Sequence, residues 1–225
     1  MGYRQSLTAN MGKEQNLDQL LKKFTKYRFP EIPEKARTVL KTTEAYEREN
    51  PRMRNVTQEL GKFLYYLVVE NNSKAVLELG TSNGYSSLWL ALAVRETGGK
   101  VTTVENQEWK AELARQNIEK AGLSDTATVI LGDALLEIPK TVDKIDFLFM
   151  DIWPGDYLSC IKKILPEMKQ DSLIVADNLL THRDREGNKI PRGPEGDDYL
   201  NFMNETLKIP GMILPIGSGV HIGFL

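Results

Sequence analysis

AVLELGTSNGYSS, residues 75–87, is the stretch that decides how this chain folds. It opens with a short apolar run of the kind found in buried strands and continues into a turn that contains glycine. Helical spacing of apolar residues begins directly after the turn, so the stretch predicts a strand, a tight turn and a helix. Gly80 and Gly84 flank the turn, where the absence of side chains lets a ligand approach the backbone.

The rest of the chain repeats this strand–helix alternation. Strand-like runs occupy residues 100–105, 126–133, 145–151 and 172–178, and helical patterns occupy 86–96, 108–122, 134–138 and 157–169. Such alternation predicts a parallel sheet with helices on both faces. The last two runs, MILPI at 212–216 and VHIGFL at 220–225, are separated by three residues. That gap permits a hairpin but no parallel crossover, so we expect a seven-stranded α/β sheet whose last strand is antiparallel.

Three helical patterns precede this sheet, at residues 17–24, 35–49 and 58–70, with prolines between them. We predict an N-terminal helical extension at residues 1–52 and a main domain at residues 53–225. The extension either packs plainly against the domain, or caps the active site or forms a dimer surface.

Composition narrows the class of protein. The 225 residues are 41% hydrophobic and 27% charged, as in ordinary globular proteins, and the net charge of -2 argues against a general nucleic-acid binder. No apolar run approaches the roughly 18 residues of a membrane span, and the first residues lack a secretory core. We therefore predict a cytoplasmic protein without nucleic-acid or membrane partners. Its single cysteine, Cys160, is expected to be a buried, inert thiol.

Acidic residues mark the predicted strand ends. Glu78 lies inside an apolar strand, which is costly unless a cationic or hydrogen-bonding ligand, or the amides of the turn, satisfies it. Glu105 ends the second strand, where a carboxylate can accept both ribose hydroxyls of a nucleoside. Asp133 ends the third, where an adenine would lie, and it also suits the cap of the next helix. Ser82 stands where a dinucleotide motif would have its second glycine.

Three oxygen-bearing side chains end the next two strands. Asp151 ends the fourth strand, and Asp177 and Asn178 end the fifth. Neighbouring parallel strands deliver such residues to one edge, where two carboxylates and an amide suit a hard cation: Mg²⁺, with Ca²⁺ or Mn²⁺ as alternatives. The competing interpretation is that these residues only end strands and cap helices.

Taken together, these motifs resemble the cation-dependent O-methyltransferases, the group of catechol and caffeoyl-CoA O-methyltransferases. The resemblance covers residues 50–225 and depends on VLELGTSNGYSS, VTTVE, GDA, FLFMDIWPGDY, LIVADN and LPIGSGVHIGF. It implies a Rossmann-like seven-stranded methyltransferase sheet of order 3-2-1-4-5-7-6 with strand seven antiparallel. It also implies S-adenosylmethionine as cofactor and a homodimer.

The resemblance also implies roles for individual residues. Glu78 would lie near the amino group of the cofactor, Glu105 would hold the ribose, and Asp133 and Ala134 would flank the adenine. The other residues expected at the cofactor are Val56, Gly80, Thr81, Ser82, Gly84, Ser86, Asp151 and Trp153. Asp151, Asp177 and Asn178 would bind the metal, which makes Asp151 one of the two predicted catalytic residues.

The chain departs from these families at two positions. Catechol-type and caffeoyl-type members carry a lysine near the Asp151-Ile152-Trp153 motif, and this chain has none there; Ser218 also replaces a common aspartate. We predict His182 as the second catalytic residue, the proton acceptor, because an unperturbed histidine suits that role; the alternative is an exposed loop histidine without a catalytic role. The polar segment 179–199 is expected to be a substrate loop, in which Arg183, Arg185 and Arg192 would meet an acidic substrate or remain solvated.

These observations predict an S-adenosylmethionine-dependent O-methyltransferase that acts on a hydroxyl of a small, catechol-like molecule with the help of a divalent cation. Two alternatives remain open at this point: a methyltransferase-fold protein that binds the cofactor without catalysis, and a nucleotide-dependent Rossmann oxidoreductase.

Overall fold

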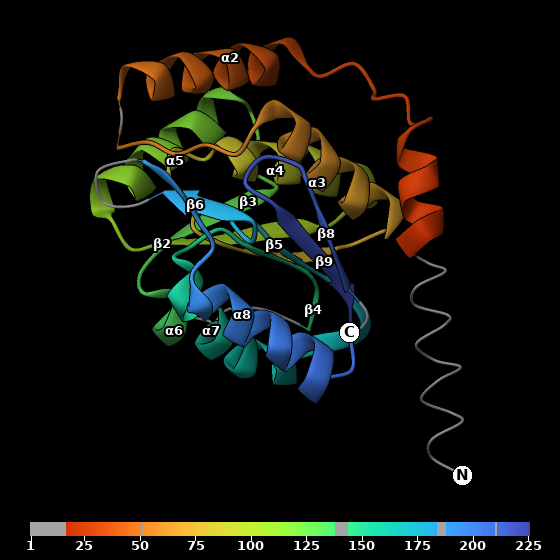
Figure 1. Ribbon diagram of the computed structural model, residues 1–225. Coiled ribbons are helices and arrows are strands. Elements are labelled where there is room, and N and C mark those ends of the chain that lie inside the picture. Colours follow the sequence, from red (N-terminus) through yellow and green to blue (C-terminus); the bar gives the residue numbers. More distant parts are fainter. Residues whose placement is uncertain (1–16, 51, 138–143, 184–187, 210) are drawn as a thin grey trace.

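A computed structural model describes residues 17–50, 52–137, 144–183, 188–209 and 211–225. A central sheet is covered on one face by helices from the first half of the chain and on the other by helices from the second half (Figure 1). The three layers follow from the alternation of apolar strands and helices, because each face of a parallel sheet must be buried.

The main sheet has seven strands. They are β1 (Ala75–Leu79), β2 (Lys100–Glu105), β3 (Ala127–Leu131), β4 (Ile145–Met150), β5 (Met168–Ala176), β8 (Gly211–Leu214) and β9 (Val220–Phe224). Their order is β3-β2-β1-β4-β5-β9-β8, and β9 runs antiparallel to both of its neighbours. This is the predicted order with the predicted reversal. Gly217 and Gly219 both have positive φ in the turn between β8 and β9, a conformation that glycine adopts without strain.

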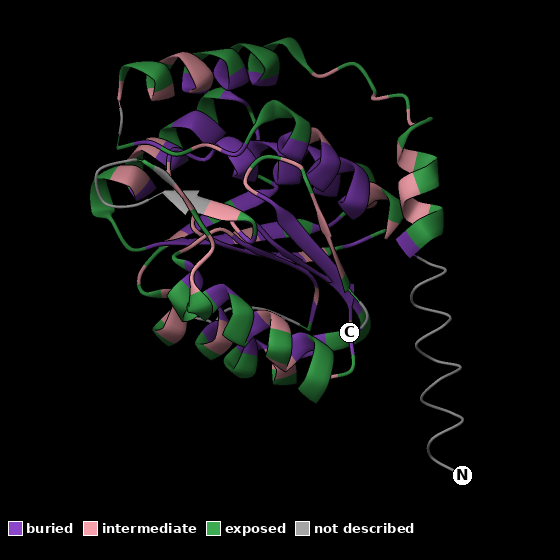
Figure 2. Cartoon of the chain, viewed as in Figure 1, coloured by how far each residue is buried: buried purple, intermediate pink, exposed green. Residues whose placement is uncertain are grey.

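The first helical layer holds α3 (Gln58–Glu70), α4 (Tyr85–Thr97) and α5 (Glu108–Lys120). On its outer side α2 (Glu34–Glu49) lies over α4 and α5, and the helix at residues 17–24 packs against α3. The second holds α6 (Ala134–Glu137), α7 (Tyr157–Ile164) and α8 (Pro194–Asn201), which continues into a π-helical turn, Phe202–Thr206. Alternate residues along each strand face opposite layers. Val76, Phe147 and Val175 therefore join one buried cluster, while Leu77, Leu148 and Ile174 join the other. Figure 2 shows buried residues throughout the sheet and on the helix faces turned toward it.

Two expectations about the second half of the chain were wrong. The helix expected at 157–169 ends at Ile164, a 3₁₀ turn spans Leu165–Glu167, and β5 begins at Met168. Pro166 lies in that turn and cannot donate the backbone hydrogen bond that a continuing helix needs. The segment 179–199, expected to be a substrate loop, contains instead a hairpin of β6 (Thr181–Arg183) and β7 (Lys189–Pro191) and most of α8. Its contact with a substrate stays a prediction.

The N-terminal helices share the core of the main domain. Leu17 and the α2 residues Ala36, Val39 and Leu40 are buried in the same cluster as α3 and α4. The boundary at residue 52 stays a prediction. None of the helices in the described ranges has the length and apolarity that crossing a bilayer requires.

Candidate functional site

The predicted site residues meet at one edge of the sheet, the carboxyl edge of the parallel strands. β1 pairs with β2 on one side and with β4 on the other, so the winding of the chain reverses direction between β1 and β4. In open α/β sheets this reversal leaves a crevice in which ligands bind. The turn after β1 and the ends of β2, β4 and β5 all reach it.

The turn after β1 is built by residues in the left-handed backbone region. Gly80, Ser82 and Gly84 have φ values of 95°, 51° and 86°. A Cβ on Gly80 would lie 2.3 Å from the backbone oxygen of Asp151, so only glycine fits where the turn passes the end of β4. The Asp151 amide donates to the Leu79 carbonyl (2.8 Å), which fixes the turn against that strand end.

Glu105 is buried beside the turn, with both carboxylate oxygens oriented by backbone amides. The amide of Ser82 donates to Oε2 (2.8 Å) and the amide of Gln107 donates to Oε1 (3.0 Å). Because an ionised carboxylate has about four acceptor positions, these bonds leave room for two hydroxyl donors. The carboxylate is therefore held in place before any ribose arrives.

Glu78 is fully buried within β1. Its Oε2 accepts a hydrogen bond from the Ser87 hydroxyl, and its Oε1 has no hydrogen-bond partner among the described residues. Glu78 therefore does not cap the backbone amides of the turn, and hydroxyl side chains of Ser86, Ser87 and Thr103 lower its pKa against the larger rise caused by burial. Burial raises the pKa of Glu78 to about 7, because the charged form loses its hydration.

The other predicted cofactor residues surround the same turn. Thr81, Ser86 and Val56 are buried, and the Thr81 hydroxyl lies 2.5 Å from that of Thr103. After β3, the exposed Asp133 caps α6 by accepting a hydrogen bond from the backbone amide of Leu135 (2.7 Å). Ala134 follows it and is half-buried. Capping and a contact with adenine are compatible roles for Asp133, since the cap uses one carboxylate oxygen.

Asp151, Asp177 and Asn178 lie side by side, as expected. The Asn178 side-chain amide donates to Asp151 Oδ1 (2.7 Å), and its backbone amide donates to Asp177 Oδ1 (2.7 Å). Beneath them, the Tyr157 hydroxyl lies 3.0 Å from the Met150 carbonyl and 3.1 Å from the Asp177 carbonyl. This buried hydroxyl bridges the ends of β4 and β5. It therefore holds together the two strand ends that carry Asp151, Asp177 and Asn178, which we call the acidic tips.

This donor set fits a hard divalent cation. Within the described residues no group of three or more His, Cys, Asp or Glu side chains could hold a metal ion, so a site here requires the amide oxygen of Asn178 as its third ligand. Turning the amide about its terminal bond presents that oxygen beside Asp151. Burial raises the pKa of Asp151 to about 6. The hydrogen bond from Asn178 and the nearby positive charges therefore do not fully offset the hydration that the ionised carboxylate loses.

Two cationic residues that the sequence analysis did not select act on Asp151. The charges of Lys110 and Arg54 both lower the pKa of Asp151, and Glu105 and Asp151 both raise the pKa of Lys110 against the larger lowering caused by its burial. The charge of Lys110 therefore acts on both the predicted ribose carboxylate and the predicted metal carboxylate. A usable signal existed, because Lys110 falls in the first turn of the helix that follows Glu105, at the same edge of the sheet.

Two large, exposed apolar residues follow the ends of β4 and β5. Trp153 and Leu180 follow β4 and β5 and are 51% and 45% exposed. The predicted proton acceptor, His182, has its backbone in β6, but its side chain lies outside the described part of the chain, as do that of Arg183 and all of Arg185. Arg192 is bound within the protein, to the Leu179 carbonyl (2.6 Å) and to Asp197 (2.5 Å).

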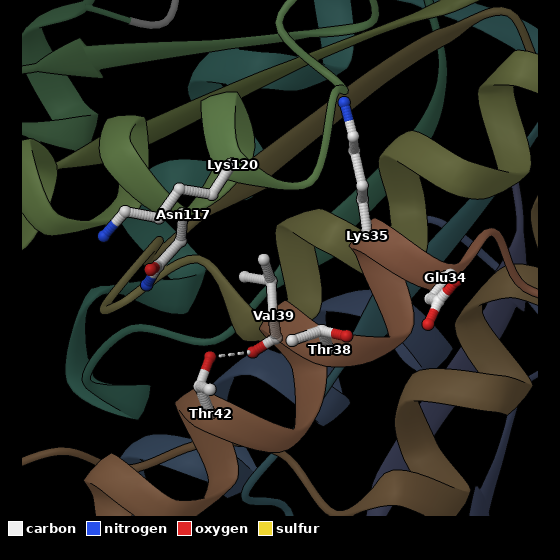
Figure 3. Close-up of a pocket in the computed structure, with 7 residues that line it drawn as sticks. All are labelled: Glu34, Lys35, Thr38, Val39, Thr42, Asn117 and Lys120. Atoms are coloured by element: carbon white, nitrogen blue, oxygen red, sulfur yellow. Dashed lines mark hydrogen bonds between the residues drawn. The ribbon is translucent and has the colours of Figure 1, made fainter.

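A separate groove of about 600 Å³ lies between α2 and α5 (Figure 3). The residues that line it are Glu34, Lys35, Thr38, Val39, Thr42, Asn117 and Lys120. It contains none of the predicted site residues, because it lies toward the C-terminal end of α5, whereas the crevice adjoins the beginning of that helix.

Comparison with known proteins assigns the family. The family model described as O-methyltransferase matches residues 33–221, which include every described site residue named above. The chain belongs to the O-methyltransferase family. The match begins at residue 33, directly before α2, so the matched region includes that helix.

Family members with names and structures give the same result. A catechol O-methyltransferase from Mycobacterium tuberculosis is 34% identical over 133 residues, 59% of this chain and 60% of that protein. Caffeoyl-CoA O-methyltransferase 1 from Eucalyptus globulus is 27% identical over 180 residues, 72% and 71% of the two chains. A solved O-methyltransferase from Bacillus cereus, in complex with S-adenosylhomocysteine, is 27% identical with a TM-score of 0.73 and covers 91% of this chain and 96% of that one. The chain thus spans about 60% of the length of the mycobacterial relative.

Proposed function

We propose that the protein transfers the methyl group of S-adenosylmethionine to a hydroxyl of a small, catechol-like molecule, assisted by a divalent cation. The observation that carries this proposal is the adjacency of Asp151, Asp177 and Asn178 next to the glycine turn. Membership of the O-methyltransferase family and the S-adenosylhomocysteine complex of the Bacillus cereus member support the reaction and the cofactor.

The pocket around the turn suits each part of the cofactor. The Oε1 of Glu78 has no hydrogen-bond partner among the described residues, so it can accept a hydrogen bond from a cationic group. The α-ammonium group of S-adenosylmethionine is such a donor. Glu105 accepts the ribose hydroxyls on oxygens that backbone amides already orient. Gly80 brings the turn close to Asp151, so the methionine part lies next to the acidic tips.

Methyl transfer requires an acceptor oxygen in line with the methyl carbon. That oxygen forms the new C–O bond while the S–C bond breaks, the sulfur leaves as a neutral thioether, and the hydroxyl proton passes to a base. A cation bound by Asp151, Asp177 and Asn178 would supply positive charge that makes the hydroxyl more acidic and orients two vicinal oxygens. Holding the reactants in alignment contributes up to about 7–11 kcal/mol in favourable intramolecular cases. His182 remains the predicted proton acceptor.

The apolar residues at the edge favour an aromatic acceptor. Trp153 follows Asp151 by two residues, Leu180 follows Asn178 by two residues, and each exposes about half of its surface. An aromatic ring that covered them would remove this surface from water, at about 25 cal/mol per Å². A catechol joins such a ring to two vicinal oxygens.

The experiment separates binding, catalysis and cation dependence. S-adenosylhomocysteine and NADH are titrated by calorimetry, and methyl transfer to a panel of catechols is measured with Mg²⁺ and with a chelator. We expect binding of S-adenosylhomocysteine alone and turnover that the chelator abolishes. Saturable binding without product for any catechol would instead indicate a cofactor-binding module, and binding of NADH would indicate an oxidoreductase.

Two aspartate variants test the cation ligands. Asp177→Ala should lose cation-dependent turnover while it still binds S-adenosylhomocysteine, because Glu78, Glu105 and the turn are unchanged. Asp198→Ala, an exposed aspartate on α8, is the matched control and should keep full activity. Equal turnover of the two variants, or activity that survives the chelator, contradicts the metal-assisted part of the proposal.

A further inference from the structure

The glycine turn is held from outside the sheet at two points, both by residues that precede α3. Tyr85, the first residue of α4, lies at one end of the turn, and Ser82 lies in its middle. Each contacts a different part of the N-terminal region. α2 lies over α4 and α5, and the chain then returns across the molecule to α3 (Figure 1).

The first contact joins α2 to the start of α4. The Tyr85 hydroxyl donates to Glu44 Oε1 at 2.6 Å. The Tyr85 ring is almost fully buried, so the bond fixes a side chain whose backbone directly follows Gly84. A hydroxyl bonded to a carboxylate is stronger than a neutral pair, and burial together with Glu44 raises the pKa of Tyr85. Tyr85 therefore remains a donor at every ordinary pH.

The second contact comes from the segment between α2 and α3. The Ser82 hydroxyl lies 3.5 Å from the sulfur of Met53, which is buried against the turn. Asn55 fastens this segment to α2, because its backbone amide donates to Glu47 Oε1 (3.0 Å) and its side-chain amide donates to the Thr43 carbonyl (3.3 Å). Glu44 of α2 thus contacts the residue that follows the glycine turn. Thr43 and Glu47 of the same helix act on the glycine turn indirectly, because they bind the segment 53–55, whose Met53 contacts Ser82.

We propose that Glu44 is a positioning residue for the cofactor: through the Tyr85 hydroxyl, α2 fixes the glycine turn in its binding geometry. Docking of α2 and binding of the cofactor then stabilise each other. This inference rests on the proposed function, because it requires that the turn binds S-adenosylmethionine. It makes the N-terminal helix part of the cofactor site, which is a more specific role than packing, capping or a dimer contact.

Coupling of this kind is reciprocal. If α2 raises the affinity for the cofactor by some factor, the cofactor raises the stability of the docked helix by the same factor. A purely structural contact would change the melting temperature without changing either quantity. Two measurements therefore distinguish a positioning role from a structural one: cofactor affinity in variants of the contact, and hydrogen exchange of α2 with and without cofactor.

The variants separate the hydrogen bond from the packing. Tyr85→Phe removes only the hydroxyl and keeps the buried ring, and Glu44→Ala removes the acceptor. Glu44→Gln keeps an acceptor oxygen and should restore most of the affinity. Glu49→Ala, an exposed glutamate on the same helix, is the matched control. Melting curves establish that each variant is folded before its affinity is measured.

The dissociation constant of S-adenosylhomocysteine, measured by calorimetry, should rise roughly tenfold in Tyr85→Phe and in Glu44→Ala, as expected for one lost hydrogen bond to a charged group. The double variant should be no weaker than either single one. The KM for S-adenosylmethionine should rise while kcat at saturation changes little. In the wild-type protein, S-adenosylhomocysteine should slow exchange of amides in residues 34–49, and Tyr85→Phe should lose that protection.

The outcomes against the inference are distinct from those against the function. If the wild-type protein binds S-adenosylhomocysteine and both single variants bind it equally well, the positioning role of Glu44 is wrong and the proposed function stands. An equal loss in Glu49→Ala also overturns the inference. If the wild-type protein does not bind S-adenosylhomocysteine, the proposed function fails, and the inference fails with it.

Discussion

A Cβ on Gly80 would lie 2.3 Å from the backbone oxygen of Asp151, a separation that side chains do not adopt. The φ of 95° at Gly80 adds a second restriction, because residues with a Cβ are strained there. The glycine is therefore required twice, once for its backbone conformation and once for the close approach of the turn after β1 to the end of β4. No neighbouring side chain can move to relieve the contact, because the opposing atom belongs to the backbone.

Replacing this glycine should separate cofactor binding from general backbone strain. Gly80→Ala forces the turn away from β4, so we expect affinity for S-adenosylhomocysteine to fall at least tenfold, with a lower melting temperature. Gly98→Ala is the control, because Gly98 also has positive φ (74°) but a Cβ there would meet no atom within 4 Å. It should cost about 1–2 kcal/mol of stability and leave affinity unchanged. Similar affinities in the two variants would contradict the role of the close approach.

The pH dependence of cofactor binding should report the buried carboxylate of Glu78. Its pKa of about 7 lies above the ordinary value of 4.5, so near neutral pH the ligand-free protein is partly protonated there. A cationic ammonium beside it favours the ionised form, so binding releases a proton and affinity rises with pH until about 7. Between pH 8 and pH 6, affinity for S-adenosylhomocysteine should fall about tenfold.

Glu78→Gln provides the control for that measurement. The amide is nearly the same size but does not titrate, so the variant should bind more weakly at pH 8 and lose the dependence between pH 6 and pH 8. Calorimetry in two buffers of different ionisation enthalpy also counts the released proton. A wild-type affinity that is flat over this range would show that Glu78 does not meet the ammonium group.

His221 should make the stability of the fold depend on pH. Burial lowers the pKa of His221 to about 4 from 6.5, with Nδ1 3.0 Å from the Tyr199 hydroxyl. The unfolded chain therefore binds a proton at higher pH than the folded one. The stabilisation is fully present above about pH 6.5 and is lost as pH falls toward 4, by roughly 3 kcal/mol in total.

Urea unfolding at pH 7 and pH 5 tests this assignment. Other groups contribute to the wild-type slope, so the informative quantity is the difference from His221→Gln, which has no group that titrates there. We expect the wild-type protein to lose about 2 kcal/mol more than the variant between these two pH values. Equal losses would assign the pH dependence to the carboxylates instead.

The sheet was predictable because its strands are unbroken apolar runs and its last turn is too short for a crossover. The hairpin of β6 and β7 was not predictable from the sequence, because its strands have three residues each and show no alternation of apolar and polar residues. The early start of β5 was hidden because Lys169, Gln170 and Asp171 are exposed and polar. They lie in an irregular part of the β4–β5 pairing, between the pairs Ile145–Met168 and Phe147–Leu173. Local pattern does not encode such pairing.

Within the site, the residues at strand ends were easier to predict than the residues whose charges change the pKa of Asp151. Asp151, Asp177 and Asn178 came together because parallel strands share an edge, a rule that needs only the order of the strands. Lys110 and Arg54 lie on a helix and on a connecting segment, and their effect on Asp151 depends on where those pack. The bond between Glu44 and Tyr85 spans 41 residues and two helices, a distance over which periodicity carries no information.

The reversal of winding between β1 and β4 divides the residues of the crevice into an earlier and a later stretch of the sequence. Everything that would grip the donor nucleoside comes from the stretch that ends at Ala134, and everything that would face the acceptor comes from β4 onward. Substitutions in the later stretch can therefore change which acceptor fits without altering the residues that would hold the donor.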